Sequence, residues 1–195
     1  MLYRLYYWLS GVFYRLQVRS LGKHTELRLQ GRIIAGKYIV IGDKVKIDPH
    51  FLLAVFPTYA GRDNPVKSNE KGIVIGEGTT FNRYLTIYCA DSVRIGKDVM
   101  FGGGILVTDN NHGMDAQSRP YSKQPLTTKE VVIEDGCWIA QNCCILAGSH
   151  IGKKSIIGAN SVVNGDIPAY TIAAGSPAKV IRKWNFEKKC WVKIK

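Results

Sequence analysis

The sequence predicts an all-β fold, a parallel β-helix, from a six-residue period, from its recurrence upstream and from the weak helical signal elsewhere. Between residues 133 and 168 an aliphatic residue opens each unit of six: Ile133, Ile139, Ile145, Ile151, Ile157 and Val163. An α-helix cannot keep one face on a strict period of six, whereas each side of a β-helix takes one short strand and one turn. Three such units, about 18 residues, close one coil.

The N-terminal segment differs from the rest, because apolar residues recur in it at helical spacing. We expect a helical segment over residues 1–30, in which Arg4, Arg15 and Arg19 accompany an apolar stripe of Leu2, Leu5, Leu9, Val12, Phe13 and Leu16. It is too short and too charged to span a bilayer, and it lacks the cleavage site of a signal peptide. Two roles fit it: a cap over the open end of the β-helix, which we favour, or a helix lying on the inner face of the cell membrane.

The six-residue phase also fills the middle of the chain, so we expect the β-helix to cover residues 31–182. Further units begin at Ile41, Ile47, Ile75, Phe81, Ile87, Ile95, Phe101 and Val107. These side chains should point inward, and each buried Ile or Val contributes roughly 1.5–3 kcal/mol. One coil cannot bury its own face, so the coils stabilise one another only by stacking.

Two segments leave the period and are expected to project as loops, at residues 51–72 and 109–130. Loops on a rigid scaffold commonly carry function. His112 begins the second loop among short polar residues, where an imidazole could act as a general base near neutral pH. His50 and His150 fall at turns, which favours a structural or solvated role. The four histidines include no close pair, so no catalytic metal is expected.

The C-terminal end of the period holds two cations, Lys179 and Arg182, three residues apart. They either belong to a cap with surface charges or clamp a phosphate-bearing cofactor. Residues 183–195 are expected to form a basic tail.

Charge and cysteine content narrow the class of protein. The formal charge of +12 admits a nucleic acid, a membrane surface or an anionic ligand as partner, but the Lys and Arg residues are scattered and no nucleic-acid-binding motif occurs. The five cysteines are odd in number and lack zinc spacing: Cys89, Cys137, Cys143, Cys144 and Cys190. We therefore expect reduced thiols, no metal and a cytoplasmic protein of one domain.

Three stretches together resemble the hexapeptide-repeat acyltransferases, and within them the galactoside, maltose and polysaccharide O-acetyltransferase group. They are Ile95-Gly-Lys-Asp-Val leading to His112, Cys137-Trp138-Ile139-Ala140, and the run from Ile167-Pro168 through Gly175-Ser176-Pro177-Ala178-Lys179 to Arg182. The resemblance implies a left-handed coil, although crossover connections are generally right-handed. It also implies a homotrimer with active sites between neighbouring subunits, and acetyl-CoA as the acetyl donor.

The resemblance assigns the reaction to a small set of residues. His112 would be the general base, and Asn82 would contact the acceptor sugar. A backbone N–H near Ala140, beside the bound coenzyme, would stabilise the tetrahedral oxyanion.

The same resemblance implies a path for the coenzyme. Trp138 would line the pantetheine channel, Ala159 and Asn164 would make small or backbone contacts, and Lys179 and Arg182 would meet the phosphates. The family often has Thr-Lys-Asp where this chain has Asn164-Gly165-Asp166, which removes one cationic contact.

The expected function is acetyl-CoA-dependent O-acetylation of a sugar hydroxyl, in a bacterial surface polysaccharide or its precursor. Three alternatives stay open: N-acetylation of an amino sugar, O-acetylation of serine, and a non-catalytic scaffold built from the same repeats.

Overall fold

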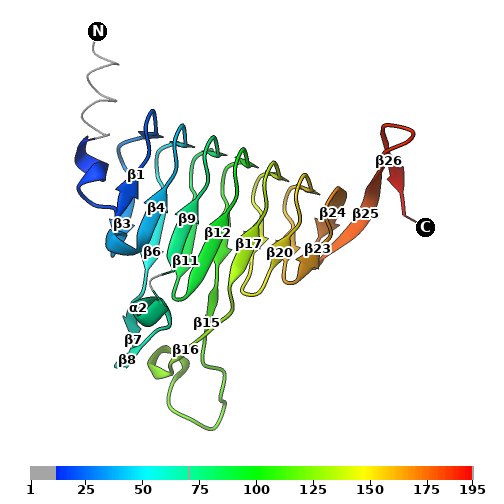
Figure 1. Cartoon of the computed structure of the whole chain (residues 1–195). Helices are drawn as coiled ribbons and strands as arrows, with labels where there is room; N and C mark the ends of the chain where they lie inside the picture. Colours follow the sequence, from blue (N-terminus) through cyan, green and yellow to red (C-terminus); the bar gives the residue numbers. More distant parts are fainter. Residues whose placement is uncertain (1–11, 70, 195) are drawn as a thin grey trace.

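The chain forms a three-sided parallel β-helix in the computed structural model, which describes residues 12–69 and 71–194 (Figure 1). Each coil contributes one short strand to each of three sheets, called here A, B and C. Sheet A contains β1 (Ser20–Leu21), β4 (Ile39–Ile41), β9 (Gly72–Ile75), β12 (Ser92–Ile95), β17 (Val131–Ile133), β20 (His150–Ile151) and β23 (Asp166–Ile167).

Sheets B and C form the other two walls of the prism. Sheet B contains β2 (Glu26–Leu27), β5 (Lys46–Ile47), β10 (Thr80–Phe81), β13 (Met100–Phe101), β18 (Trp138–Ile139), β21 (Ile156–Ile157), β24 (Thr171–Gly175), β25 (Ala178–Asn185) and β26 (Cys190–Lys193). Sheet C contains β3 (Arg32–Ile34), β6 (Leu52–Val55), β11 (Thr86–Cys89), β14 (Leu106–Thr108), β19 (Cys144–Ile145) and β22 (Val162–Val163).

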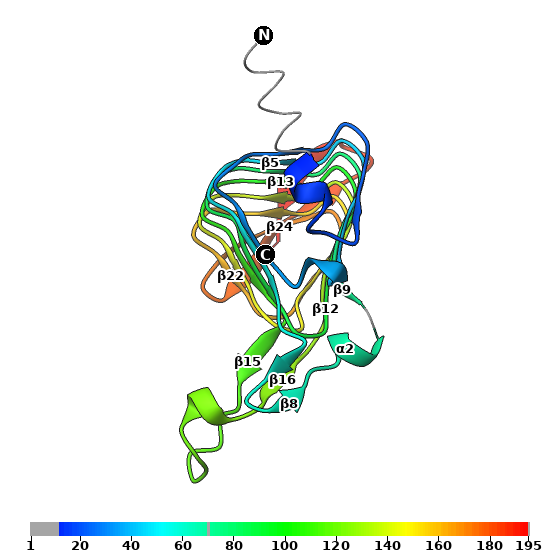
Figure 2. The ribbon, with the colours of Figure 1, turned by 90° about the vertical axis from the view of Figure 1, so that its left-hand side faces the viewer.

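The coil is left-handed. Figure 2 shows the molecule from its N-terminal end, with β9 and β12 of sheet A on the right, β5 and β13 of sheet B at the top, and β22 of sheet C on the left. The chain visits the sheets in the order A, B, C, so it turns counter-clockwise while it recedes from the viewer. The handedness implied by the family resemblance is therefore confirmed, against the general rule for crossovers.

The predicted core is confirmed, because every residue that opens a six-residue unit is buried, with an exposed fraction of 3% or less. Each unit also buries the residue two positions earlier, such as Val99 before Phe101, because side chains two apart on a strand point to the same face. Phe81 and Phe101 show the stacking, since they pair in register on β10 and β13 with ring centroids 4.4 Å apart.

Two cysteines occupy this second inward position. Cys137 and Cys143 are buried free thiols, each two residues before an isoleucine of the core. Burial raises the pKa of the Cys137 thiol to about 11 and raises the pKa of Cys143 as well. Both thiols are therefore protonated at neutral pH and act as small apolar side chains rather than nucleophiles.

The turns of the β-helix use residues with positive φ at fixed positions. Between sheets A and B the residue is Lys44, Gly78, Asp98, Gly136 or Lys154 in successive coils. Glycine is thus the turn residue in some coils, whereas lysine or aspartate adopts the same left-handed conformation in others.

The β-helix begins earlier than predicted, at β1 rather than at residue 31. Leu21 and Leu27 are buried, and Ile33 packs against the same core. These three residues already stand six apart, so the period itself extends into the segment that was expected to be helical.

A helical turn at residues 12–15 closes the N-terminal end of the prism, but with a different side chain from those predicted. Tyr14 is 1% exposed and packs against Phe51, with ring centroids 5.4 Å apart. Val12, Phe13 and Leu16 of the predicted stripe are exposed. The rest of that stripe lies outside the described residues. Within the described chain, no helix is long and apolar enough to cross a membrane.

Two excursions leave the prism at the same corner and project on the same side (Figures 1 and 2). The first, residues 56–71, carries β7 (Thr58–Tyr59), β8 (Arg62–Asp63) and α2 (Val66–Asn69). The second, residues 109–130, carries β15 (Asn110–His112), β16 (Leu126–Thr128) and the short 3-10 helix η2 (Tyr121–Lys123). A second 3-10 helix, η1 (Gly36–Tyr38), precedes β4. The predicted loop 51–72 starts too early, because Phe51 and Leu53 belong to the core.

The C-terminal residues form a hairpin instead of the predicted basic tail. β25 pairs antiparallel with β24, and β26 pairs antiparallel with β25, so the two strands extend sheet B beyond the last coil (Figure 1). Trp184 and Trp191 face each other across the hairpin with ring centroids 5.2 Å apart. This cross-strand aromatic pair stabilises an ordered hairpin in a segment whose charge alone favours a tail.

Tyr14 provides a test of the cap. Its hydroxyl accepts a hydrogen bond from Gly31 N at 3.1 Å and lies within hydrogen-bond distance of Arg28 O and Gly31 O. We expect Tyr14→Phe to lower the free energy of unfolding by about 1–2 kcal/mol, since Gly31 N loses its acceptor. Tyr14→Ala should lower it by about 3–5 kcal/mol.

Urea unfolding measures both changes, and Tyr84→Phe is the matched control because Tyr84 is 60% exposed. The control should stay within about 0.5 kcal/mol of the parent protein. A Tyr14 substitution no more costly than the control would contradict the role of Tyr14 as the cap.

Candidate functional site

The predicted site residues lie at two different corners of the prism. The corner B–C joins the end of each sheet B strand to the next sheet C strand, and the corner C–A joins sheet C to sheet A. Asn82, Ala140 and Ala159 follow sheet B strands and lie at corner B–C. His112 and Asn164 follow sheet C strands and lie at corner C–A. No single corner therefore brings all of them together.

His112 is held on the second excursion by a short antiparallel ladder. β15 pairs with β16, with Asn110 opposite Thr128 and His112 opposite Leu126. The Thr108 hydroxyl donates to Asn110 O at 3.1 Å, which fixes the backbone where the chain leaves sheet C. The excursion starts directly after β14 of sheet C, at the point where the six-residue period of aliphatic residues stops.

An aromatic cavity opens beside His112. It has a volume of about 250 Å³ and is lined by Phe56, Tyr59, Tyr88, Asn110, His112 and Leu126. The Tyr59 ring lies 5.3 Å from the His112 ring, and Phe56 and Tyr88 lie 5.8 Å apart, measured between ring centroids. Ligand pockets are usually larger, about 300–1,000 Å³, so the cavity has the size of part of a site.

The imidazole of His112 is available for chemistry. Among the described residues it makes no hydrogen bond, and its side chain is exposed. His50 and His150 make other contacts: His50 stacks on Tyr84, with ring centroids 5.2 Å apart, and His150 Nε2 lies 2.8 Å from Glu134 Oε1. This contact lowers the pKa of the Glu134 carboxyl, together with the bond from Lys153 N.

Three of the residues expected to hold the coenzyme lie on the outer face of sheet B: Trp138, Lys179 and Arg182. Trp138 stands in register with Ile156, Ile156 with Ile172, and Ile172 with Arg182, so the four form one row across β18, β21, β24 and β25. Their neighbours Ile139, Ile157 and Ala173 point into the core, so the row faces outward. Trp138 is 45% exposed.

A β-bulge places the two cations on one face. On a regular strand Lys179 and Arg182, three residues apart, would point to opposite sides. In β25, however, Val180 pairs with Ala173 and Arg182 pairs with Ile172, so Ile181 is the extra residue of a bulge. Lys179 and Arg182 therefore both lie on the outer face, with Trp138 three strands away.

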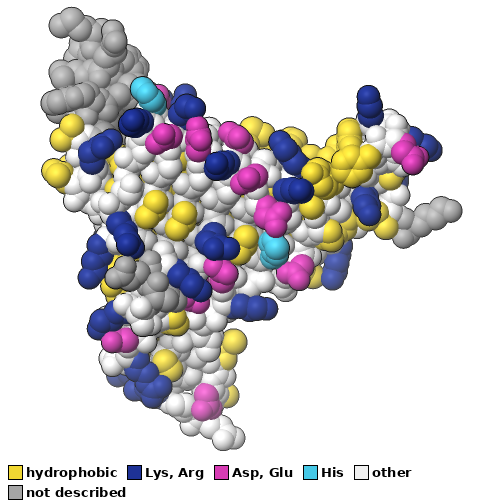
Figure 3. Space-filling view, viewed as in Figure 1, with side chains coloured by type: hydrophobic (Ala, Val, Ile, Leu, Met, Phe, Trp, Pro, Cys, Tyr) yellow, Lys and Arg dark blue, Asp and Glu magenta, His cyan; other side chains and the backbone are white. Residues whose placement is uncertain are grey.

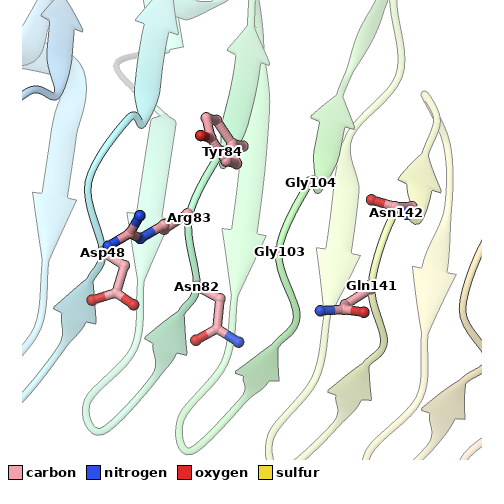
Figure 4. A pocket seen from close by; sticks show the side chains of 8 residues that line it. All are labelled: Asp48, Asn82, Arg83, Tyr84, Gly103, Gly104, Gln141 and Asn142. Carbon is pink, nitrogen blue, oxygen red and sulfur yellow. The ribbon is translucent and has the colours of Figure 1, made fainter.

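Corner B–C has a shallow trough of its own. Its volume is about 440 Å³, and four successive coils line it with Asp48, Asn82, Arg83, Tyr84, Gly103, Gly104, Gln141 and Asn142 (Figure 4). The glycines keep the trough open between two coils that carry long side chains. Asn82 thus lies among polar side chains that can form hydrogen bonds with hydroxyl groups.

The backbone N–H of Ala140 itself is unavailable for the expected role of oxyanion donor. That N–H donates to Ile157 O at 2.9 Å as part of the ladder between coils, so it is not free to bind an oxyanion. Ala159 is exposed at the same corner one coil later.

A wall of the prism separates the two corners. The residues between Asn82 and Ala90 run along sheet C, and at about 3.3 Å per residue they span on the order of 20 Å. Asn82 and His112 of one chain therefore lie at opposite edges of sheet C.

The sequence did not single out the aromatic side chains around His112. Tyr88 follows the inward Ile87 on β11 and so points outward, where a large aromatic residue is uncommon without a partner. Phe56 and Tyr59 lie in the first excursion, and only the fold brings them beside the second.

The arrangement of the charged and metal-binding side chains gives little support to a nucleic acid or a metal ion as the ligand. On the face shown in Figure 3, Lys and Arg side chains are interspersed with Asp and Glu rather than gathered in one stripe. Within residues 12–69 and 71–194, no cluster of three or more His, Cys, Asp or Glu side chains could hold a metal ion.

Comparison with known proteins agrees with this architecture. Residues 130–165 match the bacterial transferase hexapeptide (six repeats) family. A putative lipopolysaccharide biosynthesis O-acetyl transferase of Escherichia coli is 36% identical over 160 residues, covering 71% of this chain and 82% of the relative. The galactoside O-acetyltransferase of Lactococcus lactis is 30% identical over 161 residues, covering 83% of this chain and 70% of the relative.

Solved structures share the fold. A hexapeptide-repeat-containing acetyltransferase of Vibrio cholerae, complexed with acetyl-CoA, matches with a TM-score of 0.63 and 25% identity over 89% of this chain and 75% of that chain. A mutant N-acyltransferase of Bacillus cereus matches with a TM-score of 0.74 and 17% identity over 91% of this chain and 89% of that chain. With its repeats, its left-handed coil and relatives that it matches over most of their length, the chain belongs to the hexapeptide-repeat acyltransferase family.

Proposed function

We propose that this protein transfers an acetyl group from acetyl-CoA to a sugar hydroxyl of a surface glycan or its precursor, with His112 as the general base. The observation that carries the proposal is the position of His112, whose free imidazole lines an aromatic cavity on the excursion. The relatives named for lipopolysaccharide and galactoside O-acetylation support a sugar hydroxyl as the acceptor.

The chemistry needs no covalent enzyme intermediate. His112 takes the proton from the acceptor hydroxyl as its oxygen attacks the thioester carbonyl. The tetrahedral intermediate then collapses, the C–S bond breaks, and the CoA sulfur takes the proton from the imidazolium. The rings of Phe56, Tyr59 and Tyr88 would shield the reacting atoms and offer apolar faces to the sugar.

We further propose that the complete site forms between two subunits of a homotrimer. Corner C–A of one subunit, with His112, would face corner B–C and the outer sheet B of its neighbour, with Asn82, Trp138, Lys179 and Arg182. The separation of these groups within one chain supports this arrangement, as does the small volume of the His112 cavity.

The role of His112 is tested by His112→Ala. We expect turnover to fall by roughly 10²–10⁴-fold, the contribution of a general base, with little change in stability because the side chain is exposed. Thiol release from acetyl-CoA measures turnover against a panel of methyl β-galactoside, methyl α-glucoside, N-acetylglucosamine and glucosamine.

His150→Ala is the matched control, because His150 is an exposed histidine on sheet A. It should keep the parent rate. Near-normal turnover of His112→Ala would refute the assignment, and acetylation of glucosamine alone would favour an amino-sugar acceptor instead.

The coenzyme path is tested by replacing Lys179 and Arg182 together with Ala. We expect the KM for acetyl-CoA to rise about tenfold or more, since charge-assisted contacts to phosphate are lost, while the KM for the sugar stays constant. Lys188→Ala with Lys189→Ala removes the same charge from the hairpin turn and should leave both constants unchanged. Equal effects of the two double variants would show that only the overall charge matters.

Mixed assemblies test the site between subunits. Asn82→Ala and His112→Ala homotrimers should each be weakly active. Random mixing of the two subunit types should restore roughly a quarter of the parent activity, because one interface in four then pairs an intact Asn82 with an intact His112. Mixtures no more active than the separate variants would place both residues in the same subunit's site.

A further inference from the structure

The base of the second excursion contains a fully buried carboxylate with an unusual set of donors. Asp109 is 0% exposed. Its Oδ1 accepts from Ala90 N at 2.8 Å and from Asn110 Nδ2 at 2.9 Å, and its Oδ2 accepts from Asp91 N at 2.8 Å and Ser92 N at 2.7 Å. Three consecutive backbone N–H groups of one turn thus converge on one side chain, and bonds of this kind to an ionised acceptor are the stronger ones.

The thiol of Cys89 completes the set. Its Sγ donates to Asp109 Oδ2 at 3.3 Å. Burial, and then the charge and hydrogen bond of Asp109, raise the pKa of Cys89, so the thiol keeps its proton and serves as a donor. A role as hydrogen-bond donor to a buried carboxylate explains Cys89 better than catalysis does.

The same turn also holds the first excursion, through its carbonyl groups. Phe56 N donates to Cys89 O at 2.8 Å, Val66 N donates to Ala90 O at 3.0 Å, and Gly72 N donates to Asp91 O at 3.0 Å. The backbone carbonyl groups of the turn at residues 89–92 therefore accept hydrogen bonds from the first excursion and its end. The backbone N–H groups of the same turn donate to Asp109 at the start of the second excursion.

The second excursion is closed at its far end by the same group of residues. Lys129 N donates to Asp109 O at 2.8 Å, and the Ser92 hydroxyl donates to Glu130 Oε1 at 2.6 Å. Both ends of the excursion are thus tied to one turn of the preceding coil. Away from the prism the excursions meet again, where the Tyr59 hydroxyl donates to Ser122 O at 2.8 Å and the Tyr59 ring contacts His112.

We propose that Asp109 is a positioning residue for His112: by joining the turn at 89–92 to the start of β15, it sets the place of the imidazole against Phe56, Tyr59 and Tyr88. The inference rests on the proposed function, in which His112 is the base. His112 lies three residues from Asp109 on a two-stranded ladder, β15–β16, that is separate from the three sheets of the prism. A small shift of the base relative to its substrate lowers the rate strongly.

The test is a double-mutant cycle of Asp109→Asn and His112→Ala. Asparagine keeps the size of the side chain, but its NH₂ group would meet a backbone N–H in place of one accepting oxygen. We expect Asp109→Asn alone to lower kcat with methyl β-galactoside about 10–100-fold, the usual cost of a lost orienting contact, while the KM for acetyl-CoA stays constant. In the His112→Ala background the same change should cost nothing further, because the group that Asp109 positions is gone.

Amide hydrogen exchange provides a second measurement, which requires no sugar substrate. The amides of residues 110–128 should exchange faster in the full-length Asp109→Asn protein, while those of β18 to β24 keep their rates. Asp135→Asn is the matched control, because its carboxylate also accepts a backbone N–H, from Lys97 at 2.7 Å, at a corner away from His112. Asp135→Asn should change neither kcat nor the exchange rates of residues 110–128.

If Asp109→Asn does not fold, Ser92→Ala takes its place in the cycle, since it removes only the tie to Glu130. The role of Asp109 would be overturned if Asp109→Asn lowered kcat by the same factor in the parent protein and in the His112→Ala variant. It would also be overturned if the amides of residues 110–128 kept their exchange rates. Either result would leave His112 as the base. Near-normal turnover of His112→Ala would instead remove the proposed function, and this inference with it.

Discussion

The stacking of inward side chains along the axis is the constraint on which the rest of the structure depends. Each coil places two inward residues on every wall, and each finds its partner one coil above and below, as Phe81 and Phe101 do. A coil alone has no interior, so burial exists only between neighbours. The walls must therefore stay flat and in register, and all variation is forced to the corners. Both excursions leave at one such corner, which explains why the cavity forms there.

The architecture could be predicted from the sequence because its cause is periodic. The burial of residues such as Ile139 and Ile157 is predicted by their place in the six-residue period. The start of the excursion that carries His112 is predicted by the point where that period stops. The neighbours of His112 could not be predicted in this way. Tyr59 reaches it from a segment about fifty residues earlier, through contacts that no local pattern encodes. The same holds for Lys179 and Arg182, whose common face depends on a single bulge.

The two ends of the prism show why composition alone misleads. At the N-terminal end, exposed Val12 and Leu16 look like the cap, yet Tyr14 closes the core, because its hydroxyl satisfies backbone groups that an aliphatic side chain cannot. At the other end, a lysine-rich segment is ordered by two tryptophans across a hairpin. In both places specific pairing decides the structure, whereas hydropathy and charge describe only the average.

The last strand of sheet B has a consequence for self-association. A parallel β-helix resembles a short length of fibril, since every coil offers its backbone to the next one. Sheet B ends at β26, an edge to which a foreign strand could add. That edge is only four residues long and carries Lys193, with Lys188 and Lys189 in the preceding turn. Short, cationic edges repel copies of themselves, so the hairpin also serves as a stop against end-to-end polymerisation.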